Sequence, residues 1–351
     1  MEVKKRYIGG TMMQVTIKDI ARECGVSVAT VSMALSSKKT RISEKTKAKV
    51  VEVAKKYNYQ PNNAAVSLVN KKSKLIGIVF NDLRNTHISS LFMEINNVIE
   101  KKGYALVCHI IEDDEIIDCD LIKNVGAGNI SALIWAKSLQ KYTENEKQKL
   151  NDAIVRLGVP VITMERYGFT CRGTDVVFDY RQGGDMATKH LIEYGHKRIG
   201  CVAGKKNFQV TRERLEGYKM ALQEAGIPYD EELVVYGDYT MNSGYQALSY
   251  IMGKKVTAIF SMNDEMAFGV YRAARMYGVK IPEDVSIVGF DNVPFADVMQ
   301  VPLTTVHIPV EEMGKYIGER TMELIEGAEE QGRNEREYKP QLLLRGSTRK
   351  I

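Results

Sequence analysis

Polar side chains recur just after several short apolar runs of this 351-residue chain, and their types suit the binding of a small polar molecule. Carboxylate, amide and imidazole groups donate or accept hydrogen bonds to such a ligand. They are found at Asn81, Asp82, Asn85, His87, Glu165, Arg166, Asn263, Asp264, Asp291 and Asn292. Each of these residues taken alone also fits a helix cap or a turn. Their recurrence favours one shared binding site, to which Arg214 and Tyr239 would add a hydrogen bond and a stacking surface.

Motifs of the common enzyme classes are incomplete in this sequence. Gly126 and Gly128 lack the third glycine of a dinucleotide fingerprint, and Gly204-Lys205 lacks the other residues of a phosphate-binding loop. Neither H-E-x-x-H nor G-x-S-x-G occurs. His196, in a Tyr-Gly-His turn, is interpreted as structural. We therefore predict no catalytic residue, no metal and no cofactor.

The elements that must position the polar residues follow an alternating pattern. Apolar runs interpreted as strands lie at 75–80, 104–110, 131–135, 160–164, 199–204, 257–262 and 285–290. The segments between them are amphipathic, and the examples at 92–103 and 265–278 end in glycine, as helices often do. This alternation predicts parallel, doubly wound α/β sheets in two lobes. Ligands of such folds bind outside the carboxyl ends of the strands, where the polar residues stand.

The N-terminal part has a different, purely helical pattern. Residues 16–35 predict a helix that starts with a capping box at Thr16, a turn at Gly25 and a second helix capped by Ser27. A third helix is indicated after Ser43. Three short helices are typical of a DNA-binding headpiece, although packed helix pairs also occur without that role. Residues 61–74 are interpreted as a hinge helix or a plain linker.

Charge supports the DNA-binding interpretation. In residues 1–74, 16 Lys and Arg face 5 Asp and Glu, whereas the remainder holds 33 and 39. A basic module on an acidic body indicates a polyanion partner, and a solvated basic surface is the alternative. The five scattered cysteines form no C-x-x-C pair, and no window has the ~20 apolar residues of a membrane span. Residues 1–13 are expected to be a disordered leader without a secretory signal, and the protein is expected in the cytoplasm, associated with the nucleoid.

These segments together resemble the LacI/GalR family of bacterial transcription regulators, from about Val15 to Arg349. The resemblance is carried by TIKDIARECGVSVATVS, YQPNNAAVSL, HLIEYGHKRIGCVAG, RLEGYKMAL, SMNDEMAFGVYRAARMYGVKIPEDVSIVGFDN and PLTTVHIP. It implies a helix-turn-helix headpiece joined to a two-lobe core similar to periplasmic binding proteins. It also implies a homodimer on double-stranded, pseudo-palindromic operator DNA, with no membrane partner. A trailing leucine heptad is missing, which favours a dimer over a tetramer.

The resemblance assigns DNA-contacting residues to the headpiece and hinge. They are Thr16, Ser27, Val28, Ala29, Thr30, Ser32, Met33, Asn62 and Leu68. Thr16, Ser27 and Ser32 would contact phosphates, and Leu68 would wedge into a minor-groove step. The family usually has arginine where this chain has Met33, so the operator is expected to differ at that base. The hinge also reads Ala65-Val66-Ser67-Leu68 where the family often has Ala-Arg-x-Leu.

The resemblance also assigns the effector-binding residues of the core. They are Asn85, His87, Glu165, Arg214, Tyr239, Asn263 and Asp291. Glu165 stands where aspartate is more usual, and Thr86-His87 replaces an aromatic pair. The expected effector is a sugar or sugar derivative, with a purine or nucleoside as the alternative.

The expected organisation is a leader at 1–13, a headpiece at 14–60, a hinge at 61–74 and an effector and dimerisation domain at 75–351. Within that domain we expect an N-lobe of 75–172 and 303–335 and a C-lobe of 173–300 and 336–351. The function predicted from these parts is an effector-controlled regulator, most simply a repressor. A stand-alone sugar- or solute-binding protein and an α/β enzyme acting on a sugar or nucleoside are the alternatives. The first predicts a signal peptide and no basic headpiece, which the sequence contradicts, and the second would need a catalytic pair in the cleft.

Overall fold

The chain divides into two compact units, Met1–Ser73 and Lys74–Ile351. The structure is a computed structural model that describes residues 7–8, 11–12, 15–35, 42–59, 73–111, 122, 130–137, 142–166, 168–328 and 333–351. The hinge residues Asn62 and Leu68 lie outside this described part, and so does most of the predicted hinge at 61–74. Each unit is described below by itself.

The described part of the first unit contains three helices around a small apolar core. The helices are α1 (Ile17–Cys24), α2 (Val28–Leu35) and α3 (Glu44–Lys56). Ile20, Val31 and Val50, one from each helix, are fully buried. The caps follow the sequence, since Asp19 Oδ2 accepts the Thr16 amide at 3.1 Å and Ser27 Oγ accepts the Thr30 amide at 3.1 Å. The predicted helix-turn-helix is therefore present.

The predicted disordered leader at 1–13 is wrong in part. Tyr7–Ile8 (β1) and Thr11–Met12 (β2) pair as antiparallel strands. Tyr and Ile favour strands, and the sequence between the two strands is Gly-Gly, a dipeptide typical of β-hairpins.

The second unit is built on two six-stranded sheets, which define its two lobes. In the N-lobe the strand order is β13-β7-β6-β5-β3-β4, and every pairing is parallel. The N-lobe elements are β3 (Leu75–Phe80), α5 (Thr86–Lys101), β4 (Ala105–Ile110), β5 (Ile130–Trp135), α7 (Glu144–Leu157), β6 (Val161–Thr163), β7 (Gly173–Phe178), α12 (Val310–Glu326) and β13 (Arg333–Tyr338). Strands such as β3 and β5 are nearly continuous buried runs because helices cover both faces of the sheet.

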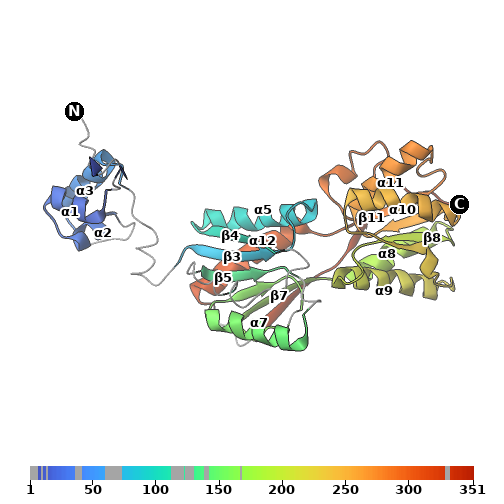
Figure 1. Cartoon of the computed structure of the whole chain (residues 1–351), viewed down its shortest axis with the longest axis horizontal. Helices are drawn as coiled ribbons and strands as arrows, with labels where there is room; N and C mark the ends of the chain where they lie inside the picture. Colours follow the sequence, from blue (N-terminus) through green and yellow to red (C-terminus); the bar gives the residue numbers. More distant parts are fainter. Residues whose placement is uncertain are drawn as a thin grey trace. The chain divides into compact units, whose positions relative to one another are not determined.

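The C-lobe sheet has the order β14-β12-β11-β10-β8-β9. Its strands are β8 (Ile199–Ala203), β9 (Val234–Tyr236), β10 (Ala258–Ser261), β11 (Ser286–Asp291), β12 (Thr304–His307) and β14 (Gln341–Leu343). Its helices are α8 (Tyr180–Glu193), α9 (Gln209–Glu224), α10 (Met241–Gly253) and α11 (Asp264–Tyr277), with 3-10 turns η1 (Glu231–Leu233) and η2 (Pro294–Ala296). In Figure 1, α8 and α9 lie on one side of this sheet and α10 and α11 on the other. All seven predicted strands are present, and the predicted fold class is confirmed.

The predicted boundaries between the lobes are wrong. Strand β7 belongs to the N-lobe sheet, β12 belongs to the C-lobe sheet, and the whole of β13 belongs to the N-lobe sheet. The chain therefore crosses between the sheets near Asp179, Pro309 and Lys339, each time just after a strand has ended. The parallel strands of each sheet end at the edge that faces the other lobe, so the chain can cross only after a strand has ended. The predicted crossover at 172/173 comes before β7 and would have separated β7 from the N-lobe sheet in which it pairs.

One strand departs from the predicted parallel arrangement. Strand β14 is antiparallel to β12, with Val306 opposite Leu342. The other C-lobe strands end at the edge facing the N-lobe, whereas β14 starts there directly after the third crossover. The chain therefore has to run in the opposite direction along this edge of the sheet.

Candidate functional site

A cleft of about 480 Å³ lies within the second unit, where the carboxyl ends of both sheets meet. Residues of both lobes line it. They are Phe80, Asn81, Asp82, Arg84, Asn85, His87, Ile88, Ala136, Met164, Glu165, Tyr180, Lys205, Phe208, Gln209, Val210, Arg214, Asp238, Tyr239, Thr240, Glu265 and Asp291. Its position agrees with the rule that ligands of doubly wound folds bind beyond the strand ends.

The N-lobe side of the cleft is formed by the segment between β3 and α5. Asn85 caps α5, because its Oδ1 accepts the amides of His87 at 2.9 Å and of Ile88 at 3.3 Å. Asn85 and His87 both line the cleft, and the cap fixes the backbone that carries them. Burial, the Arg214 charge and His307 lower the pKa of His87 to about 3, so its imidazole is neutral at physiological pH.

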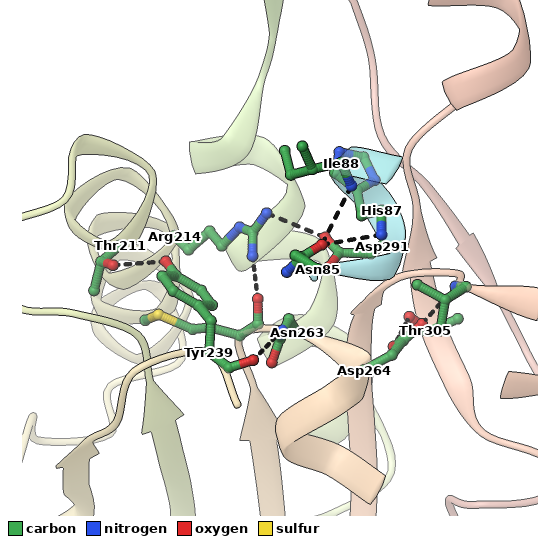
Figure 2. A network of polar contacts seen from close by, with 12 residues as sticks. Asn85, His87, Ile88, Thr211, Arg214, Tyr239, Asn263, Asp264, Asp291 and Thr305 are labelled. Carbon is green, nitrogen blue, oxygen red and sulfur yellow. Dashed lines mark hydrogen bonds and ion pairs between the residues drawn. The ribbon is translucent and has the colours of Figure 1, made fainter. Parts of the chain in front are cut away.

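Arg214 is the central group of the C-lobe side, and only 5% of its surface is exposed. In Figure 2 it extends from α9 toward Asp291, with the Tyr239 ring beside it. Its Nη2 lies 3.3 Å from Asp291 Oδ1, its Nη1 donates to the Met262 carbonyl, and its guanidinium stacks at 3.8 Å over the Phe290 ring. Gly184 of α8 permits this placement, since a Cβ there would collide with the backbone oxygen of Arg214.

Tyr239 is held in the left-handed region, with φ +70°. Its hydroxyl pairs with Thr211 Oγ1 at 2.6 Å, and its carbonyl accepts from Asn263 Nδ2 at 3.0 Å. Asn263 is buried, caps α11 through the Met266 amide and is not part of the cleft lining. The structure therefore places Asn263 behind Tyr239, as a positioning residue, and not at the surface where we predicted a ligand contact.

Two buried carboxyl groups lie side by side at the end of the C-lobe sheet. Burial raises the pKa of Asp291 to about 6, and Arg214 opposes that shift. Burial and the neighbouring Asp291 raise the pKa of Asp264 to about 8. Asp264 accepts from Thr305 Oγ1 at 2.6 Å and from the Val293 amide at 2.9 Å, so it connects the start of α11 to β12 and to the segment after β11. Asp291, by contrast, lines the cleft.

A hydrogen-bonded contact joins the two lobes at the cleft. Glu265, in the first turn of α11, accepts from both the amide and the hydroxyl of Thr86 at 3.0 Å. Thr86 is the first residue of α5 in the other lobe. One carboxylate thus lies near the N-termini of two helices, where the helix dipoles favour negative charge.

The structure brings together six of the seven predicted effector residues: Asn85, His87, Glu165, Arg214, Tyr239 and Asp291. The sequence analysis missed several others, among them Tyr180, Lys205, Phe208, Asp238 and Glu265. Lys205 follows β8 and Asp238 follows β9, so the strand-end rule would have found Lys205, and also Asp238 had β9 been recognised. His196, predicted to be structural, is buried and bonds Thr257, Ser286 and the Arg349 carbonyl.

The face of α2 that we predicted to contact DNA bases is exposed in the first unit. Val28, Ala29, Ser32 and Met33 are exposed, while Val31 and Ala34 point into the core. Met33 and Val28 keep 45% and 40% of their surface exposed, a large fraction for apolar side chains. Thr30 is half-buried and shares a hydrogen bond with Ser27, and the Thr16 hydroxyl donates to Asp19 at 2.7 Å.

Comparison with known proteins gives this arrangement a context. Residues 16–62 match the model for bacterial regulatory proteins of the lacI family, and residues 188–348 match a periplasmic binding protein-like domain. The repressor PurR of Photobacterium profundum is 33% identical over 341 residues, which cover 96% of this chain and 99% of the relative. None of the described helices is long and apolar enough to cross a membrane.

Two solved structures show the same fold. A lac repressor dimer bound to operator and an anti-inducer matches 96% of this chain and 100% of that chain, with a TM-score of 0.83 and 26% identity. A regulator of Enterococcus faecium with bound ribose matches 79% of this chain and 99% of its own, with a TM-score of 0.70 and 25% identity. The curated relatives include the transcriptional regulator DegA of Bacillus subtilis, which is 31% identical over 309 residues, as well as the repressor PurR. The chain therefore belongs to the LacI family of bacterial DNA-binding transcriptional regulators.

Proposed function

We propose that the protein is a repressor that binds a pseudo-palindromic operator as a homodimer, and that a small polar effector in the inter-lobe cleft controls this binding. The observation that carries the proposal is the cleft itself, because Asn85 and His87 of one lobe and Arg214 and Tyr239 of the other line the same space. A ligand held by both lobes has a different affinity for each angle between them. It therefore shifts the population between DNA-competent and incompetent states.

The DNA contacts follow from the exposed face of α2. Val28, Ala29, Thr30 and Met33 would face base edges in the major groove. Ser27, Ser32 and Thr16 would contact phosphates. The Thr16 hydroxyl donates to Asp19, so it would have to give up that hydrogen bond in order to donate to a phosphate. Asn62 and Leu68 complete the proposed contacts from the hinge.

The effector-binding residues proposed from the structure are Asn85, His87, Glu165, Arg214, Tyr239 and Asp291, with Asn263 supporting Tyr239. A sugar is favoured over a purine or nucleoside, since the E. faecium regulator of the same family was solved with ribose. We expect this protein to act in the cytoplasm, at the nucleoid, where operator DNA is found.

Fluorescence anisotropy with labelled DNA from upstream of the protein's own gene tests this function. We expect saturable binding whose affinity falls steeply with salt, because phosphate contacts release counterions. Ala29→Asp places a negative charge on the exposed face of α2 and should abolish binding. Ala48→Asp makes the same change at an exposed position of α3 and is the matched control. Equal DNA affinity of the Ala29→Asp variant and the wild type would contradict the proposed reading helix.

A further inference from the structure

A short network of hydrogen bonds connects three C-lobe segments beside the second crossover between the lobes. Arg345 Nη2 donates to Asn292 Oδ1 at 2.7 Å, and Asn292 Nδ2 lies 3.2 Å from His307 Nδ1. Arg345 follows β14, Asn292 follows β11, and His307 is the last residue of β12. Only Ile308 and Pro309 separate His307 from α12. The network therefore ends at the point where the chain passes from the C-lobe to the N-lobe.

The network has a fixed polarity. An arginine side chain only donates, so the Asn292 oxygen accepts and its Nδ2 group is the donor toward His307. His307 Nδ1 is then the acceptor, which requires a neutral ring with its proton on Nε2. A second proton would place an N–H on Nδ1 against the N–H of Asn292. Turning the Asn292 amide over does not help, because its NH2 would then meet the Arg345 guanidinium, which donates to the Leu303 carbonyl at 2.8 Å. A proton on Nδ1 and the hydrogen bond to Asn292 thus exclude each other.

The same network reaches the cleft. Asn292 directly follows Asp291, and the two residues have left-handed backbones at φ +57° and φ +105°. Asp291 is the register partner of His307 in the pairing of β11 with β12, and its Oδ1 lies 3.3 Å from Arg214 Nη2 at the cleft. The contact between Asn292 and His307 is thus one of those that hold this strained segment, and with it the cleft carboxylate, in place.

The surroundings of His307 favour a ring that is neutral at physiological pH and takes up a proton on acidification. Burial lowers the pKa of His307 below its ordinary value, Glu311 and Glu312 of α12 oppose this shift, and Arg345 adds to it. His87 of α5 is close enough for a charge on one ring to disfavour a charge on the other. His307 is half-buried, and histidine is the side chain whose charge ordinarily changes between pH 5 and 8.

We propose that His307 is a proton-operated switch at the crossover between the lobes. With a neutral ring, the network fastens the second crossover to the Asp291–Asn292 segment, and a proton on the ring breaks the network and frees the angle between the lobes. In a regulator whose operator binding depends on that angle, acidification shifts the population between DNA-competent and incompetent states. This consequence for DNA rests on the proposed function, whereas the switch itself does not.

Energy transfer between a dye on α7 and a dye on α10 reports the lobe angle of the full-length protein. From pH 7.5 to pH 5 the wild type should show a one-proton transition with a midpoint below 6.5. His87 and His190 stay mostly neutral over this range, because burial lowers their pKa values to about 3 and about 4. His307→Asn keeps an acceptor near the Nδ1 position but cannot titrate, so it should lose the transition. His109→Asn, at another half-buried histidine, in β4, is the matched control and should keep it. A transition that persists in His307→Asn, or is missing in the wild type, overturns the inference.

A second variant separates protonation of the ring from breakage of the network. Asn292→Asp has nearly the same shape, but its carboxylate only accepts, so it bonds to Arg345 and also to an Nδ1–H of His307 in either charge state. NMR of labelled histidine should show the midpoint of His307 raised by about one pH unit or more, since a negative charge now lies beside the ring. Energy transfer should nevertheless stay constant, because the network survives the proton. An acid transition of wild-type size in Asn292→Asp would overturn the role of Asn292 and with it the switch.

The operator assay distinguishes a failure of this inference from a failure of the proposed function. With the labelled upstream DNA described above, the wild type should change its affinity by about threefold or more between pH 7.5 and pH 5.5 relative to His307→Asn. Operator binding at pH 7.5 without any acid transition in energy transfer overturns the switch and leaves the proposed function standing. An acid transition of the expected kind in a protein that binds no operator DNA supports the switch and contradicts the proposed function.

Discussion

Backbone strain in the second unit is concentrated next to the cleft. Tyr239 at φ +70°, Asp291 at φ +105° and Asn292 at φ +57° adopt a conformation that residues other than glycine rarely take. Such positions cost about 1–3 kcal/mol each and persist only where the surroundings impose them. Asn263 fixes the Tyr239 carbonyl, and Arg345 Nη2 donates to Asn292 Oδ1 at 2.7 Å. Hydrogen bonds to neighbouring residues thus hold this strained backbone in place beside the cleft.

The neutral His87 ring should leave a signature in the pH dependence of stability. Its pKa is lowered to about 3 in the folded protein, whereas an unfolded histidine titrates near 6.5. Between these values the unfolded chain binds more protons, so this contribution to stability falls as the pH is lowered from 6.5 to 3. His87→Gln removes that loss. Relative to the wild type, the variant should gain about 2 kcal/mol between pH 7.5 and pH 5 in urea unfolding, and parallel pH curves would contradict the buried neutral ring.

Met33 should determine one base preference of the operator. Its exposed thioether offers only apolar contact, whereas arginine donates two hydrogen bonds to guanine. Met33→Arg should therefore create a preference for guanine at one position in each half-site, worth about 1–3 kcal/mol per half-site. Selection from a randomised operator library, run on both proteins in parallel, measures it. Identical selected sequences would place Met33 away from the bases.

At the scale of elements, the hydrogen bonds between Thr86 and Glu265 connect the start of α5 to the start of α11. Glu265→Gln keeps one acceptor but removes the charge that both helix N-termini favour, and we expect a loss of about 1 kcal/mol in unfolding free energy. The lobes should also separate more readily, which a pair of dyes on the two lobes would detect as lower energy transfer. Thr86→Ser, which retains the amide and the hydroxyl, is the control. Unchanged transfer in Glu265→Gln would show that this contact does not hold the lobes.

The elements that the sequence predicted are those whose stability is local or fully apolar. Buried runs such as β3 and β5 were predictable, because both faces of their sheet are covered. Strand β13 was not, since its residues RNEREY show no apolar pattern and it pairs only with β7 at the sheet edge. Strand β12 contains two buried threonines whose hydroxyls are paired far away in sequence. Thr304 Oγ1 accepts from the Arg345 amide, and Thr305 Oγ1 donates to Asp264.

The candidate site was predictable to the extent that strand ends and family resemblance place residues along the chain. Those rules located Arg214 and Tyr239 but could not tell which polar groups point into the cleft. Asn263 follows a strand as Asp291 does, yet its amide is used to cap α11 and to hold Tyr239. Glu265 was missed for the opposite reason: a glutamate in the first turn of a helix is ordinary locally, and its partner Thr86 comes from the other lobe.

At the scale of the whole molecule, effector and operator must influence each other by the same factor. If the sugar changes operator affinity tenfold, operator DNA must change sugar affinity tenfold in the same direction, because both report one coupling free energy of about 1.4 kcal/mol. Titrating sugar into protein alone and into the protein–operator complex, and DNA in the presence and absence of sugar, measures both sides. Arg214→Ala should lose the sugar response while operator binding without sugar remains, since the headpiece and the core are separate units. Factors that differ between the two directions would mean that the sugar and the DNA are not acting on a common equilibrium of this chain.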